Sequence, residues 1–202
     1  MNYENATKTI QQHIDQFAKG PNASITQDAK LLIQNQLDDL VNVAKRAGVK
    51  ESDLTIVLQD AVDKLLYQTV ETIKRQLGDH GIRHISGNIR ANRQIMETYE
   101  SAGVPFTATD ELEMMLTHIG HDMGYTSVID LKGFTGTGAH PHISMNLLEN
   151  GPVNVKNAYK RILGEDGYSR MKQSILNHDG TEVLKVNPAT MTSTELRTAA
   201  FE

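Results

Sequence analysis

The sequence of 202 residues contains no cysteine, which excludes disulfide bonds and thiolate metal sites. It also lacks any run of about 18 apolar residues, so we expect no membrane-spanning helix and no membrane partner. The first five residues lack the basic and apolar segments of a secretory signal. These absences together predict a cytoplasmic protein.

The chain also lacks an excess of positive charge, because 25 acidic residues outnumber 20 lysines and arginines. Nucleic acids and anionic membranes attract cationic surfaces, so a net charge of −5 argues against both as partners. Residues 130–140 form a glycine-rich stretch without the GxxxxGK[ST] spacing of a nucleotide P-loop. The sequence therefore does not predict a P-loop nucleotide site.

Histidine is the residue type that the sequence offers for chemistry. Seven of the eight histidines fall between residues 80 and 178, and only His13 lies outside. Within that window, residues 116–125 place His118, His121 and Asp122 close together. Neutral imidazoles and a carboxylate, with no thiol, suit Mn, Fe, Co, Ni or Zn in a catalytic site. We therefore predict a metal site.

The predicted metal ligands come from four separate segments, and they are His84, His121, Asp122, His140 and His178. His80 precedes His84 by four residues, a spacing that gives either two ligands or one ligand and one helix-capping histidine. For His118 two interpretations stay open, a core histidine that supports a ligand and a proton carrier.

Apolar spacing predicts an all-α protein. In residues 1–79 it indicates three helices that end near Gly20, Gly48 and Gly78, and we expect them to serve packing or dimerisation. A capping box of Asp110 and Glu113 predicts a helix from Asp110 to Gly124. Residues 130–140 read as a loop that lies over the metal site.

Further helices are expected over 143–148, 155–163 and 168–177, with a loop at 164–167. A final helix should begin near residue 193, and 182–186 is the one candidate strand.

The order of these histidines resembles the HD superfamily of metal-dependent phosphohydrolases. His84 matches the first histidine of that family, His121-Asp122 the pair that names it, and Gly124 the glycine that often follows. The segment beginning at His140-Pro141-His142 resembles the third-histidine helix, and His178 matches the fourth histidine.

The resemblance covers roughly residues 80–180. It implies an HD-like helical domain over 80–202 with an N-terminal helical extension over 1–79, or one continuous domain.

The same resemblance implies hydrolysis of a small phosphorylated substrate, which would be a phosphomonoester, a nucleotide or a phosphodiester. One or two divalent ions (Mn, Fe, Mg, Co, Ni or Zn) would activate a water molecule, and Asp122 would orient it. His118 and Asp179 are the candidate proton carriers or supporting residues. The expected substrate-binding residues are Arg83, Arg90, Lys132, Thr135 and Thr137.

Two departures from the family pattern keep other functions open. Tyr125 stands where the cyclic-dinucleotide phosphodiesterases usually have a lysine, and no aspartate follows Asp179 to close the site. These departures favour a non-catalytic metal-binding sensor or interaction domain as the alternative. A di-iron oxygenase, which uses the same ligand set, is a third possibility. A homodimer through the N-terminal helices fits each of these functions.

Overall fold

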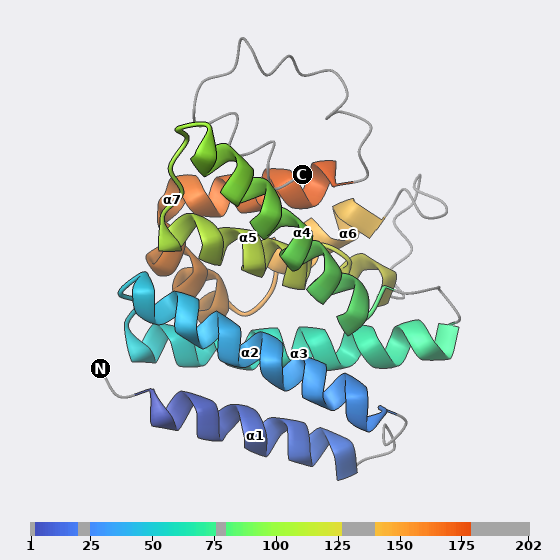
Figure 1. Ribbon diagram of the computed structural model, residues 1–202. Coiled ribbons are helices and arrows are strands. Elements are labelled where there is room, and N and C mark those ends of the chain that lie inside the picture. Colours follow the sequence, from blue (N-terminus) through green and yellow to red (C-terminus); the bar gives the residue numbers. More distant parts are fainter. Residues whose placement is uncertain (1–2, 20–24, 76–79, 127–139, 179–202) are drawn as a thin grey trace.

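The computed structural model describes residues 3–19, 25–75, 80–126 and 140–178, and every element in these ranges is helical (Figure 1). The all-α prediction is therefore confirmed for this part of the chain. The elements in order are α1 (Glu4–Lys19), α2 (Gln27–Arg46), α3 (Glu51–Arg75), α4 (Ile82–Ser101), α5 (Ala108–Gly120), the 3-10 helix η1 (Met123–Thr126), α6 (His140–Glu149) and α7 (Val153–Asn177).

Helices α1, α2 and α3 form the N-terminal layer, and α4 to α7 lie on the side of α2 and α3 away from α1 (Figure 1). Helix α3 is shared between the two parts, because it packs against α1 and α2 and also against α4, α5 and α7. One hydrophobic core runs through both parts, from Tyr3 in the N-terminal layer to Ile175 in α7. This continuity favours the one-domain version of the predicted organisation.

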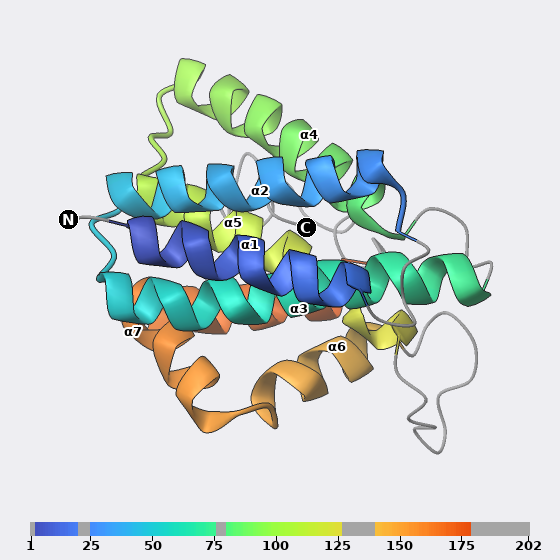
Figure 2. The same cartoon turned by 90° about the horizontal axis from the view of Figure 1, so that it is seen from below.

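Seen along the other direction, α4 lies at one edge of the molecule, while α6 and α7 lie at the other (Figure 2). Helix α5 runs between these edges and contacts both α4 and α7. It is also the most completely buried of the described helices, since every residue from Leu112 to Gly120 is buried. Side chains from α4 and from α7 can therefore both approach residues at the end of α5.

Buried ion pairs and hydrogen bonds cross-link α5, α7 and α3. Arg170 donates two hydrogen bonds to the fully buried Glu113, at 3.0 and 2.6 Å. The buried hydroxyl of Tyr159 donates to Asp60 at 2.7 Å, and Asp60 also pairs with Lys64. Removing one member of such a buried pair typically costs about 3–5 kcal/mol, because the other charge is left without a partner.

Both predicted boundaries of the helix expected from Asp110 to Gly124 were wrong, and the helix expected over 143–148 begins earlier, at His140. Helix α5 begins at Ala108, with a capping box made by Thr107 and Asp110. Glu113 does not take part in the cap, because its side chain is buried against Arg170. Helix α5 ends at Gly120 and not at Gly124, so His121 and Asp122 lie in the turn after it.

The loop predicted at 164–167 is instead a kink within α7. Gly164 adopts φ 74° and ψ 169°, a backbone conformation that side chains disfavour, and helical structure continues on both sides. The expected strand at 182–186, the final helix and the loop at 130–139 lie outside the described residues. Within the described residues, no helix combines the length and apolar character needed to cross a membrane.

Candidate metal centre

Two of the predicted ligands are held by the same local motif, a histidine at the C-cap of a helix. His121 follows α5, and its Nδ1 lies 2.7 Å from the carbonyl oxygen of His118. His178 follows α7, and its Nδ1 lies 2.6 Å from the carbonyl oxygen of Ile175. Because a carbonyl only accepts, each Nδ1 carries the proton, and in the neutral ring each Nε2 presents a lone pair.

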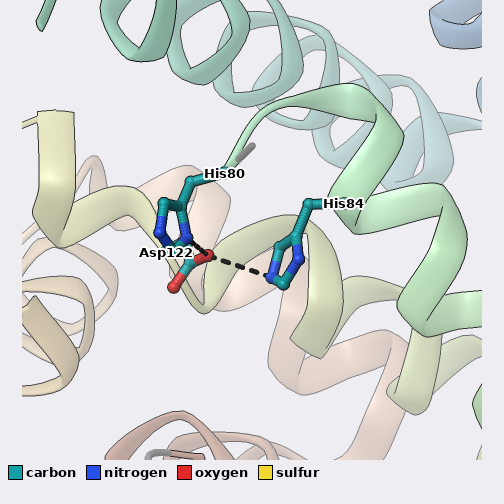
Figure 3. Close-up of side chains that lie close together, drawn as sticks. All are labelled: His80, His84 and Asp122. Atoms are coloured by element: carbon teal, nitrogen blue, oxygen red, sulfur yellow. Dashed lines mark hydrogen bonds and ion pairs between the residues drawn. The ribbon is translucent and has the colours of Figure 1, made fainter. Parts of the chain in front are cut away.

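One carboxylate oxygen of Asp122 faces three imidazoles on what we call the α4 side of the site (His80, His84 and His121). Asp122 Oδ2 lies 3.1 Å from His80 Nδ1, 3.3 Å from His84 Nε2 and 3.2 Å from His121 Nε2. Figure 3 shows His80, just before α4, and His84, in the first turn of α4, both directed at this carboxylate. The two rings converge because the chain turns into α4 at Gly81.

The other oxygen of Asp122 faces two imidazoles on what we call the α6–α7 side (His140 and His178). Asp122 Oδ1 lies 3.3 Å from the Nε2 of His140 and 3.3 Å from the Nε2 of His178. These two Nε2 atoms are 2.6 Å apart, and those of His84 and His121 are 3.3 Å apart. Asp122 therefore stands between two groups of nitrogen donors, one on each oxygen.

The spacing of the donors around Asp122 fits divalent ions, whereas the 2.6 Å between the Nε2 atoms of His140 and His178 is shorter than two ligands of one ion require. Ligands about 2.0–2.2 Å from an ion, at tetrahedral or octahedral angles, lie about 2.8–3.6 Å from one another. The distances from Asp122 to the five histidines, 3.1–3.3 Å, fall in that range. The C-terminal ends of α5 and α7 also point at the site, and the partial negative charge of a helix C-terminus favours a cation. His and Asp groups at this position can thus hold metal.

The electrostatics of the site put the negative charge on Asp122. Burial acts to raise the pKa of Asp122, but hydrogen bonds from His121, His140, His178 and His84 outweigh it and hold that pKa well below its ordinary value. Burial lowers the pKa of His121, so its imidazole is neutral at physiological pH. An ionised carboxylate beside a neutral imidazole is the protonation state that metal binding requires.

A close backbone approach holds α6 against this site. A Cβ atom on Gly124 would lie 2.0 Å from the carbonyl oxygen of His140, so only glycine fits there. The N–H of Gly124 donates to Ser144 Oγ at 2.7 Å, which fastens η1 to α6. Tyr125 then stacks on His140, with ring centroids 4.0 Å apart, and its ring lies 4.4 Å from that of His80. One aromatic ring thus contacts a histidine from each side of the site.

Helix α3 supports the two helix ends that carry the ligands. Gln68 donates to the carbonyl oxygen of Ile119 at 2.7 Å, one residue before α5 ends. Thr69 Oγ1 accepts a hydrogen bond from the N–H of Ile82, the first residue of α4, at 3.3 Å. No motif in the sequence indicated that these two buried polar residues support the site.

His118 lies behind His121 and not among the groups around Asp122. Its side chain is buried, and its Nε2 lies 2.7 Å from the amide nitrogen of Asn92 on α4. Burial, together with the neighbouring His121 and His84, lowers the pKa of His118 to about 3. Such a group stays neutral near pH 7 and is a poor proton acceptor, which favours the supporting role over proton transfer.

The structure brings all five predicted ligands together and adds His80, which the sequence analysis left as one of two alternatives. Tyr125 and the asparagines of α4 were also missed as neighbours of the site. Arg83 and Arg90, predicted to bind substrate, are exposed on α4. Lys132, Thr135, Thr137 and Asp179 lie outside the described residues, so their roles stay predictions.

Comparisons with family models, with curated proteins and with solved structures found no match for this chain.

Proposed function

We propose that this protein is a metal-dependent phosphohydrolase that acts on a small phosphorylated substrate. The observation that carries the proposal is the position of Asp122, whose two oxygens each face a separate group of imidazole nitrogens. A carboxylate shared in this way suits two divalent ions side by side. The order of the ligands along the chain, which resembles that of the HD superfamily, supports the same reaction class.

Ions held there would polarise a phosphoryl oxygen and lower the pKa of a bound water to near neutrality. The protein's own contribution is orientation. The C-cap hydrogen bonds fix the rings of His121 and His178, and the ionised Asp122 can accept a hydrogen bond from the attacking water. His80 and His84 are the more exposed ligands, so the α4 side is where a substrate would arrive.

A second candidate, a non-catalytic metal-binding sensor, is favoured by one observation. Tyr125, and not a cation, packs against His80 and His140, and Arg83 and Arg90 are exposed on α4. Within the described part of the chain, neutralisation of a phosphoryl group would then fall to the metal. Activity measurements separate the two candidates.

The test is metal analysis of the purified protein followed by assays on a panel of phosphomonoesters, nucleotides and cyclic dinucleotides. We expect turnover by the metal-loaded wild type, and its loss in Asp122→Ala with the helical circular dichroism kept. Asp166→Ala, an exposed aspartate on α7, is the matched control and should stay active. A metal-loaded wild type that hydrolyses nothing on the panel would favour the sensor, and unfolding of Asp122→Ala would assign the metal a structural role.

A further inference from the structure

Helix α4 carries a polar stripe that continues away from the metal ligands. His84, Asn88 and Asn92 recur every fourth residue and therefore share one face of the helix. That face is turned towards α5, since His84 approaches His121 and Asn92 approaches His118. Polar side chains between packed helices need partners there.

Asn92 has a structural explanation. Its amide nitrogen lies 2.7 Å from His118 Nε2 and also donates to the carbonyl oxygen of Asn88 at 3.3 Å. It thereby joins α4 to α5 one turn beyond Asn88. The side chain of Asn88 is thus held between two cross-helix contacts, the one made by His84 and the one made by Asn92.

The contact of Asn88 differs, because among the described residues it is made to a proposed metal ligand on its own helix and not to α5. Its amide nitrogen lies 3.0 Å from His84 Nε2, and that same Nε2 is 3.3 Å from both Asp122 and His121. A metal ion on the α4 side takes the lone pair of His84 Nε2, and the N–H of Asn88 then loses its acceptor. A half-buried amide donor that loses its acceptor needs another one, which is either a water molecule or an oxygen of a bound ligand.

The geometry points to that acceptor being an oxygen of the substrate: we propose that Asn88 donates a hydrogen bond to a phosphoryl oxygen bound on the α4 side. This inference rests on the proposed function and names the residue that binds the phosphoryl group there. Two observations favour an incoming oxyanion. The α4 side is the more open side, with His80 and His84 side chains 32% and 31% exposed, and the neutral amide offers two N–H donors without adding charge.

The proposal is tested with inorganic phosphate as the probe. Mn²⁺-loaded wild type, Asn88→Ala and Asn88→Asp are compared for bound manganese and for phosphate affinity, measured by paramagnetic broadening of the phosphorus resonance. Asn157→Ala, an exposed asparagine on α7, is the matched control. We expect unchanged manganese content in Asn88→Ala and phosphate binding weakened about ten- to hundred-fold, the usual worth of a hydrogen bond to a charged oxygen. Asn88→Asp should bind phosphate no better, because its carboxylate repels the anion.

Three results would overturn the proposal. Loss of manganese in Asn88→Ala, with retention in Asn88→Asp, would make residue 88 a metal ligand through its side-chain oxygen. Equal phosphate affinity in wild type and Asn88→Ala would show that Asn88 donates no hydrogen bond to the phosphoryl oxygen. A wild type that binds no phosphate would reject the proposed binding site as a whole.

These outcomes are distinct from failure of the proposed function. Phosphate binding that depends on Asn88, in a protein that hydrolyses nothing, keeps the binding site and rejects the enzyme. Hydrolysis that is equally fast in wild type and Asn88→Ala keeps the proposed enzyme and rejects the phosphate contact of Asn88.

Discussion

The two sides of Asp122 share one carboxylate but differ in how open they are. On the α4 side, His80 and His84 are 32% and 31% exposed and His121 is 5% exposed, whereas on the α6–α7 side His140 and His178 are 10% and 15% exposed. The α6–α7 side is also fastened by the contact of Gly124 with the His140 backbone and by Ser144. An ion on the enclosed side should therefore exchange slowly, and one on the open side should exchange quickly and accept further ligands.

The largest expected effect comes from the group that both sides share. Asp122→Asn keeps the size of the side chain but removes its negative charge, so we expect both ions to be lost together. Metal content after desalting, measured by mass spectrometry, should fall from two ions per chain to none. Retention of one ion would show that a single side binds without the carboxylate and would reject the shared-ligand interpretation.

The next largest effect should separate the two sides. Because each substitution removes one nitrogen donor, His84→Ala should leave only the slowly exchanging ion, and His178→Ala only the rapidly exchanging one. The measurement is the time course of metal release to a chelator, which should have two phases in the wild type and one in each variant. His142→Ala, an exposed histidine on α6, is the control and should keep both phases. The same single phase in both variants would contradict the asymmetry.

A smaller and one-sided effect is expected from Gly124→Ala. The added Cβ would meet the carbonyl oxygen of His140 at 2.0 Å and must push α6 away, which should cost about 1–3 kcal/mol of unfolding free energy. The enclosed ion should bind more weakly, about 10- to 100-fold, because its ligand is displaced.

Gly87→Ala is the matched control for this substitution. Nothing lies within 4 Å of a Cβ placed there, and removing a glycine from the interior of α4 should stabilise the protein by about 0.5–1 kcal/mol. Denaturant unfolding and metal titration measure both variants. Equal effects of the two substitutions would mean that α6 tolerates the shift.

Much of the fold, and the set of histidines that lie together around Asp122, could be predicted from the sequence, because helical periodicity and histidine spacing are local signals. The three N-terminal helices are present, and His121-Asp122 lies at the end of a buried helix as expected. Local signals gave a wrong prediction where a residue distant in the sequence determines the position of a side chain. Glu113 was assigned to a helix cap, whereas Arg170, 57 residues away, holds it in the core.

The supporting residues of the site could not be predicted for the same reason. Gln68 and Thr69 sit in an amphipathic helix that carries no motif, and only the packing of α3 against α4 and α5 gives them a role. His80 was ambiguous because the sequence does not reveal that the chain turns at Gly81, just before α4 begins. The spacing of His84, Asn88 and Asn92 was the one signal that could have been used and was not.

The smallest expected effect is that of replacing Tyr125, which should weaken metal binding on both sides of Asp122. Its ring stacks on His140 and lies beside His80, so it restricts one ligand from each side without binding an ion itself. Aromatic pairs of this kind are worth about 0.5–1.5 kcal/mol, so Tyr125→Ala should weaken both binding phases by up to about ten-fold.

Tyr125→Phe keeps the ring and should leave both affinities unchanged, which separates stacking from any role of the hydroxyl. Calorimetric metal titration of the three proteins measures this. Weakening confined to one phase would place Tyr125 on that side alone, and an effect of Tyr125→Phe equal to that of Tyr125→Ala would transfer the role from the ring to the hydroxyl.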